Sequence, residues 1–195
     1  MKYLLFVPLL LAALSGTAFA DDLTTVRDNL ESKLNAVLDV MEQEDLDHDT
    51  KQDRVVGIME PLFDFALMSY YALGKTHWSG LSSEDKKRFT ELFTKWLKET
   101  YLPRIVDLYT DEKITLQTPI ETENKIHIPA LVITQDENLS FVFKFIERNN
   151  DWRIYDVELE GVSIVGSSRS QFNESLQSGT FEELLKTLEE MESDR

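Results

Sequence analysis

Apolar residues recur at helical spacing through the first half of the chain. Residues 22–46 predict an amphipathic helix, a second helix is expected over 51–59, and Pro61 fits the first turn of a third. The third helix contains Phe63 and Met68, is apolar almost all round, and is expected to end at Gly74. A helix of this kind is either deeply buried or faces a cavity.

A long fourth helix is expected after Ser82-Ser-Glu-Asp85, because Ser-x-x-Asp is a capping-box spacing. One stripe of this helix is apolar, and it includes Phe89, Phe93, Trp96, Leu97, Tyr101 and Ile105. The sequence therefore predicts a helix with one face buried against another layer of the fold.

From Lys113 the hydrophobic period changes from 3.6 to 2, which predicts strands. Four are expected, at 114–116, 126–133, 139–146 and 152–159, with turns short enough for antiparallel neighbours. Alternation predicts that Phe141, Phe143 and Phe145 share one face of the third strand, and that Tyr155, Val157 and Leu159 share one face of the fourth. The run continues through Val162 to residue 165, and residues 166–168 are expected to interrupt it.

Two short helices close the chain. The first is expected over 169–176, and the second begins at the capping box Thr180-Phe-Glu-Glu183. The order of elements predicts one α+β domain, with helices packed on one face of a curved four-stranded antiparallel sheet. Large apolar side chains then face each other across the layers. Periodicity does not distinguish a filled core from a lined pocket, so the residues alone leave both open.

Residues 1–20 have the features of a cleaved secretory signal peptide. Lys2 precedes an apolar stretch, and Ala18-Phe19-Ala20 matches the cleavage pattern, which leaves 21–195 as the mature domain. Lys2 is the only charged residue removed, so the formal net charge changes from −16 to −17. Such an acidic chain argues against nucleic acid as a partner and against stable binding to an anionic bilayer. The chain has no Cys, so its stability must come from packing.

The sequence offers little for catalysis. His48, His77 and His127 lack the spacing of metal ligands, and the segment 161–166 misses the G-x-S-x-G nucleophile motif by one residue. A calcium loop starting at Asp45 would need Gly at position 50 and Glu at position 56, where Thr50 and Val56 stand. We therefore predict a binding protein, with no catalytic residue, metal or cofactor.

Two blocks resemble the MlaC family, also called the toluene-tolerance auxiliary proteins. They are residues 58–78 (IMEPLFDFALMSYYALGKTHW) and residues 151–172 (DWRIYDVELEGVSIVGSSRSQF). The resemblance implies a cystatin-like or nuclear-transport-factor-like cone that encloses an apolar cavity. It also implies a soluble periplasmic phospholipid carrier that shuttles lipid between an outer-membrane lipoprotein complex and an inner-membrane ABC transporter, and so maintains outer-membrane lipid asymmetry. A binding module for another apolar cargo, such as a hopanoid, is the alternative.

The same resemblance turns the facing apolar positions into an expected lipid cavity. Its lining is predicted to be Phe63, Met68, Phe93, Trp96, Leu97, Tyr101, Ile105, Phe141, Phe143, Phe145, Tyr155, Val157 and Val162. Arg169, which matches the family's R-x-Q-F, is expected to organise the strand-to-helix turn rather than to bind a head group. The acidic chain is expected to be a monomer that meets basic patches on its protein partners.

Overall fold

The computed structural model describes residues 17–107, 113–133 and 138–193. In order, its elements are α1 (Thr17–Met41), α2 (His48–Met59), the 3-10 helix η1 (Glu60–Leu62), α3 (Phe65–Leu73), α4 (Lys75–Ser79), α5 (Ser83–Asp107), β1 (Lys113–Leu116), β2 (Ile120–Thr122), β3 (Lys125–Ile133), β4 (Asn138–Arg148), β5 (Asp151–Leu159), β6 (Val162–Ser163), α6 (Ile164–Ser178) and α7 (Phe181–Ser193). None of the helices in these ranges has an apolar stretch long enough to cross a membrane.

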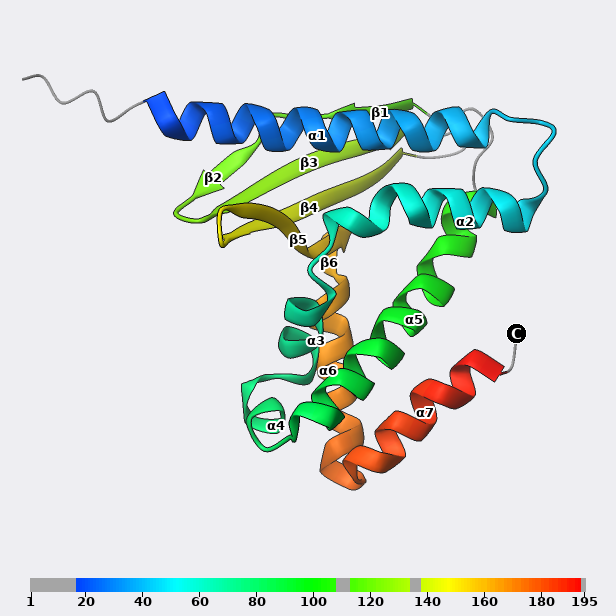
Figure 1. The fold of residues 1–195 in the computed structure, drawn as a ribbon, viewed down its shortest axis with the longest axis vertical. Coiled ribbons are helices and arrows are strands. Elements are labelled where there is room, and N and C mark those ends of the chain that lie inside the picture. The colour runs from blue at the N-terminus through cyan, green and yellow to red at the C-terminus, as the bar shows by residue number, and fades with distance from the viewer. Residues whose placement is uncertain (1–16, 108–112, 134–137, 194–195) are drawn as a thin grey trace, which may run out of the picture.

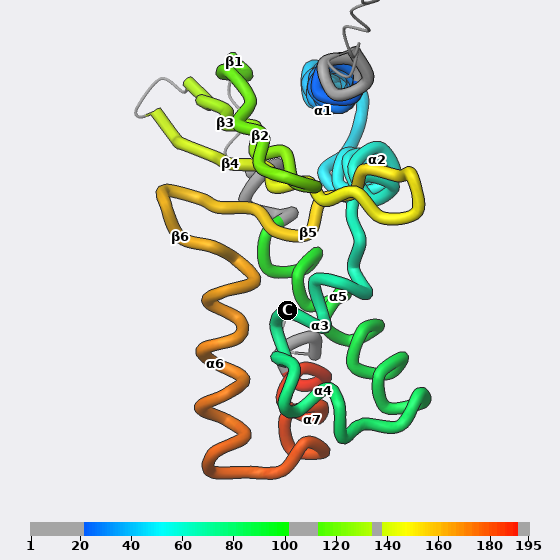
Figure 2. The backbone as a smooth tube through the Cα atoms, turned by 90° about the vertical axis from the view of Figure 1, so that its left-hand side faces the viewer, coloured from blue at the N-terminus to red at the C-terminus, as the bar shows by residue number. Residues whose placement is uncertain are grey.

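The strands form one antiparallel sheet. Their order is β1-β3-β4-β5-β6, and β2 pairs with β3 beside β1. α1 runs along the sheet, and α2 runs back below α1 (Figure 1). The other helices extend away from the sheet, and Figure 2 shows α6 leading down from β6 to α7 at the far end of the molecule. The protein is therefore a single α+β fold with a sheet end and a helical end.

Each end has its own hydrophobic core. At the sheet end, Leu30 and Leu34 of α1 pack with Ile128 of β3, Phe143 of β4 and Val157 of β5. At the helical end, α3, α5, α6 and α7 pack around aromatic rings, and the stacked pair Phe89–Phe93 has a centroid separation of 5.8 Å. α5 belongs to both ends of the fold, because it starts in the helical core and runs up towards the sheet (Figure 1).

A bulge in β5 changes which side chains reach the core. Phe143 pairs with Val157, and Phe145 pairs with Ile154, so three residue positions on β5 correspond to two on β4. Ile154 and Val157 therefore share the core face, and the extra residue Tyr155 lies outside it. The strict alternation predicted for this strand is wrong at that point, because a bulge reverses the facing of every residue before it.

The predicted α+β class is confirmed, but the sheet has six strands and not four. The two additional strands, β2 and β6, are too short to show a period. The fourth helix starts as predicted, since the Ser82 hydroxyl accepts a hydrogen bond from the Asp85 N–H at 3.1 Å. The last helix also starts as predicted, because Thr180 and Glu183 cap each other's backbone N–H groups.

Three helix starts are set by a local cap at positions that differ from the prediction, and the end of the first helix also differs. α1 ends at Met41, and α2 starts at His48 because the Asp47 carboxylate accepts from the Thr50 N–H at 2.8 Å. α3 starts only at Phe65, where the Asp64 side chain accepts from the Leu67 N–H. α6 starts at Ile164 rather than 169, because the Ser163 hydroxyl caps the Gly166 N–H. The predicted break at 166–168 is therefore wrong.

Candidate functional site

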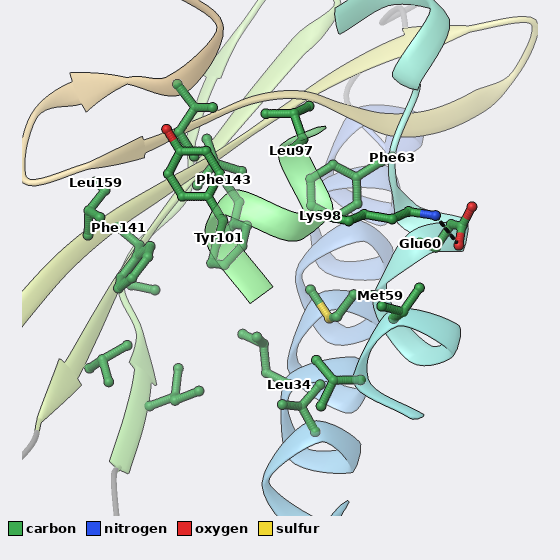
Figure 3. Close-up of a pocket in the computed structure, with 18 of the residues that line it drawn as sticks. Leu34, Met59, Glu60, Phe63, Leu97, Lys98, Tyr101, Phe141, Phe143 and Leu159 are labelled. Carbon is green, nitrogen blue, oxygen red and sulfur yellow. Dashed lines mark ion pairs between the residues drawn. The ribbon is translucent and has the colours of Figure 1, made fainter. Parts of the chain in front are cut away.

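An apolar cavity of about 320 Å³ lies between the sheet and the helices. α1 and α2 form one wall, β1, β3, β4 and β5 form the opposite wall, and the C-terminal half of α5 reaches in from the helical end (Figure 3). The described residues that line it are Leu34, Val37, Leu38, Met41, Val55, Val56, Met59, Glu60, Phe63, Phe65, Met68, Leu97, Lys98, Tyr101, Ile114, Ala130, Val132, Leu139, Phe141, Phe143, Val157, Leu159 and Ile164. Its volume is within the range of small-molecule sites, about 300–1,000 Å³.

The helical wall comes from the apolar stripe of α1. Leu34, Leu38 and Met41 follow one another at helical spacing and project towards the cavity together with Val55 and Met59 of α2. Near the end of the hairpin, α1 and α2 form a small core of their own around Val37, Val40, Met41 and Val55. Val37, Met41 and Val55 of this small core also line the cavity.

The sheet wall is formed by paired residues on one face of β3, β4 and β5. Phe141 pairs with Ala130 of β3 and Leu159 of β5, and Phe143 pairs with Ile128 and Val157. Because directly paired residues of antiparallel strands share a face, these side chains form one continuous apolar surface. The Phe141 and Phe143 rings stack with their centroids 6.4 Å apart. Figure 3 shows both residues across the cavity from Leu34 and Met59.

The helical end of the cavity is aromatic. Phe63 and Phe65 stack with a centroid separation of 5.5 Å, and Met68, Leu97 and Tyr101 lie beside them in the lining. Phe63 is held in place because it is extended and forms a parallel bridge with Ile154 of β5. The two rings also border a polar recess in which Arg148 pairs with Asp64 at 2.8 Å and Arg153 pairs with Asp151 at 2.6 Å.

One ion pair interrupts the apolar lining. The Lys98 Nζ lies 2.8 Å from the Glu60 Oε2, and these are the charged side chains among the described residues that line the cavity. Lys98 also lies over the Phe65 ring, 5.6 Å from its centroid. The side chains of Lys98 and Glu60 remain 29% and 45% exposed, so this is where the lining meets water.

Seven of the predicted site residues line the cavity. They are Phe63, Met68, Leu97, Tyr101, Phe141, Phe143 and Val157. Ile105 belongs to α5, but its side chain lies outside the described residues. Whether any of these residues contacts a lipid stays a prediction.

The structure places the other five predicted residues elsewhere. Phe93 and Trp96 pack in the helical core, with centroid distances to Phe172 of 5.7 Å and 6.1 Å, because that part of α5 lies beside α6. Phe145 is one pair further along β4 and is enclosed by protein, with 1% of its surface exposed. The bulge moves Tyr155 to the outer face of the sheet. Val162 is 58% exposed on the short strand β6.

Sequence reasoning missed the lining from α1 and α2. The stripe Leu34, Leu38 and Met41 is visible in the sequence, but its spacing predicts only the face by which a helix packs on a sheet. This stripe does not show whether the opposite layer of the fold contacts the helix or leaves a space.

The outer face of the sheet has a compact polar cluster. Lys144 pairs with Asp156 at 3.2 Å and also with Glu158, while Asp156 accepts hydrogen bonds from the Ser163 hydroxyl at 2.7 Å and the Val165 N–H at 3.1 Å. Asp156 is only 5% exposed. The cluster therefore holds the start of α6 against β5, with every buried acceptor of Asp156 occupied.

Two titratable groups border this cluster. The His127 Nε2 lies 3.2 Å from the Tyr155 hydroxyl. Burial, assisted by the nearby Lys144, lowers the pKa of His127, and burial raises the pKa of Tyr155. Pairing with Glu158 and Asp156 outweighs burial and raises the pKa of Lys144. Neither His127 nor Tyr155 lines the cavity, and no group of three or more His, Cys, Asp or Glu in the described ranges could hold a metal ion.

Arg169 lies in the middle of α6 and packs over Gly74. A Cβ atom added to Gly74 would lie 3.4 Å from the Arg169 Nε, and Gly74 has a φ of +80°. Arg169 therefore packs where α6 meets the junction of α3 and α4. It does not organise the strand-to-helix turn, which is capped by Ser163. Arg169 is not among the residues that line the cavity.

Comparison with known proteins identifies the family. The family model described as MlaC protein matches residues 31–190. The chain belongs to the MlaC family. No curated protein matches it. Among solved structures, a phospholipid-binding protein from Ralstonia solanacearum, determined in complex with a phospholipid, has a similar fold with a TM-score of 0.73. The match has 18% sequence identity and covers 85% of this chain and 96% of that chain. The fold described above is thus the MlaC fold.

Proposed function

We propose that this MlaC protein is a soluble periplasmic carrier of diacyl phospholipid rather than an enzyme. The observation that carries the proposal is the apolar cavity between the α1–α2 hairpin and the sheet. The relative from Ralstonia solanacearum, whose structure holds a phospholipid, supports the same cargo. The predicted signal peptide at residues 1–20 supports export.

Energetics explain why such a carrier needs an enclosed site. Burying one methylene contributes about 0.8 kcal/mol, so an acyl chain of ~15 methylenes costs roughly 12 kcal/mol to expose to water. A lining of Leu, Val, Met and Phe side chains gives the chains an environment similar to the bilayer interior. The polar head group gains nothing from entering, so it stays at the surface of the cavity.

Release must take place on a partner, because a lipid that leaves into water meets the whole of that cost. We propose an outer-membrane lipoprotein complex and an inner-membrane ABC transporter as the donor and the acceptor, which would let the carrier maintain lipid asymmetry. The chain has 36 Asp and Glu against 20 Lys and Arg, so basic patches on these partners would attract it. Anionic vesicles without a partner protein should not bind it.

The test is to identify what the purified protein holds. Native mass spectrometry should show one added mass in the range of a diacyl phospholipid, and the organic extract should contain phosphorus. Only the unliganded mass, with no lipid phosphorus in the extract, would contradict the proposal. A bound polycyclic molecule without phosphorus would favour a hopanoid-like cargo instead.

A pair of variants assigns the lipid to the cavity. Leu139 lines the cavity, and the adjacent Ser140 on β4 points away from it and is exposed. Leu139→Trp should fill part of the space and reduce the bound lipid, while Ser140→Trp should leave it unchanged. Equal lipid content in both variants would place the lipid outside this cavity.

A further inference from the structure

The ion pair between Glu60 and Lys98 lies at the one place where the cavity lining carries charge among the described residues. Glu60 follows α2 in η1, and Lys98 is on α5, so the pair joins the helical wall of the cavity to the helical end of the fold. Figure 3 shows it beside Phe63, on the opposite side of the cavity from Phe141 and Leu159.

An amphiphile in this cavity has a defined orientation. Its acyl chains belong against the apolar walls, and its head group belongs where the lining meets water. Both charged side chains are partly exposed and both border the cavity, so they satisfy that condition. The Lys98 Nζ itself lies over the Phe65 ring, so the ammonium group is held at the boundary between the apolar wall and solvent.

We propose that Glu60 and Lys98 form a head-group site that selects zwitterionic aminophospholipid, a deeper statement that rests on the proposed function. The Lys98 ammonium would donate to the lipid phosphate, and the Glu60 carboxylate would accept from the head-group amine. The lipid thereby replaces one ion pair with two. Each protein charge keeps a partner of opposite sign, so neither is left unpaired when the lipid binds.

An anionic lipid without an amine fits the pair less well. Its phosphate can pair with the Lys98 ammonium group, but the Glu60 carboxylate then loses its partner and lies next to a second negative charge. Like charges brought together at a binding site disfavour the wrong ligand. Glu60 is therefore the residue that discriminates, and Lys98 contributes to binding both kinds of lipid.

The experiment is a competition between two lipids. Delipidated protein is mixed with equal amounts of phosphatidylethanolamine and phosphatidylglycerol dissolved in detergent, so that no vesicle has to be bound. The detergent is removed, the protein is re-isolated, and its bound lipid is quantified by mass spectrometry. The wild-type protein should hold more phosphatidylethanolamine. For partly exposed charges, Glu60→Gln should reduce the ratio about two- to five-fold, and Lys98→Gln should weaken the retention of both lipids by a similar factor.

Lys87 and Glu91 provide matched controls. They also form a Lys–Glu pair on α5, at 3.7 Å, but they are 77% and 65% exposed and do not line the cavity. Glu91→Gln and Lys87→Gln change the net charge by the same amounts as the two test substitutions. They should leave both the lipid ratio and the retention unchanged.

The outcomes separate this inference from the proposed function. If wild-type protein takes up neither lipid, the carrier function itself is wrong. If it takes up lipid but Glu60→Gln leaves the ratio unchanged, or Glu91→Gln lowers it equally, the head-group site is wrong and the carrier function stands. Thermal unfolding of each variant, and the retention of selectivity in Glu60→Asp, show that a changed ratio comes from the lost charge and not from misfolding.

Discussion

Two phenylalanines on one strand test whether the space under the sheet is a binding cavity. Phe143 and Phe145 are two residues apart on β4 and share a face, and each pairs with one residue of β3 and one residue of β5, although the bulge in β5 lies between their partners. Phe143 lines the cavity, whereas Phe145 is enclosed by protein, and their exposed fractions are 9% and 1%. The same truncation to alanine at the two positions therefore differs mainly in what the removed ring was touching.

The expected losses of unfolding free energy follow from that difference. Removing the Phe145 ring loses its transfer free energy and also leaves a new closed void, which together cost about 3–5 kcal/mol. Removing the Phe143 ring only enlarges a cavity of about 320 Å³ that is already present. The void contribution is then largely absent, and a loss of about 2 kcal/mol, close to the transfer free energy of one Phe side chain, remains.

Lipid should increase the loss of stability at Phe143 and leave the loss at Phe145 unchanged. A ligand that binds only the folded state adds about 2.7 kcal/mol of stability at a hundred times its dissociation constant. If Phe143→Ala weakens lipid binding tenfold, it loses about 1.4 kcal/mol of that addition. Phe145→Ala should retain the full addition, because its ring does not border the cavity.

The assay is urea unfolding of the wild type and both variants, each delipidated and each reloaded with lipid, followed by circular dichroism. The reasoning is refuted if delipidated Phe143→Ala loses as much stability as Phe145→Ala and lipid stabilises both variants equally. In that case Phe143 belongs to ordinary core.

Three further predictions concern residues outside the cavity. Because burial and Lys144 lower the pKa of His127 from its usual 6.5, the contribution of His127 to stability is full above pH 6.5 and is lost as the pH falls below that value. The difference in unfolding free energy between wild type and His127→Gln should therefore shrink from pH 8 to pH 5, and a constant difference would contradict this. Asp156→Ala should cost about 3–5 kcal/mol in urea unfolding, since it leaves the Val165 N–H and part of the Lys144 charge without a buried partner, whereas a loss below 1 kcal/mol would mean that water replaces the carboxylate. Gly74→Ala should lower stability by about 1–3 kcal/mol, because the φ of Gly74 is +80°. Gly57→Ala in α2, where a Cβ meets nothing within 4 Å, should raise stability by about 0.5–1 kcal/mol. Equal effects of the two substitutions would show that backbone conformation does not decide them.

Local signals in the sequence predicted the elements well where a cap or a long period was present. Ser82 and Thr180 start their helices as expected, and the strands at 126–133 and 152–159 were placed within a residue of their bounds. The predicted start of α6 was wrong because Gly166, Ser167 and Ser168 have the composition of a loop. A single hydroxyl, that of Ser163, is enough to start the helix before them.

The site was harder to predict, because it depends on which surfaces meet. Phe93 and Leu97 are one helical turn apart on the same stripe of α5 and both pack in the helical core, yet Leu97 also lines the cavity and Phe93 does not. The bulge in β5 has no clear marker in the sequence, and it decides that Tyr155 faces outward. The space opposite Leu34 and Leu38 depends on the position of the hairpin relative to the sheet, which residue patterns do not encode.

The two walls of the cavity are far apart in the sequence, and this sets an order for folding. β3, β4 and β5 pair with their neighbours through short connections, so they can form early. Leu30 and Leu34 of α1 are synthesised first, yet they pack with Phe143 and Val157, more than a hundred residues later. The apolar face of α1 therefore stays uncovered until the strands exist, a stage at which such surfaces aggregate readily. Because both walls are needed to form the cavity, the chain can accept no lipid before its last strands are in place.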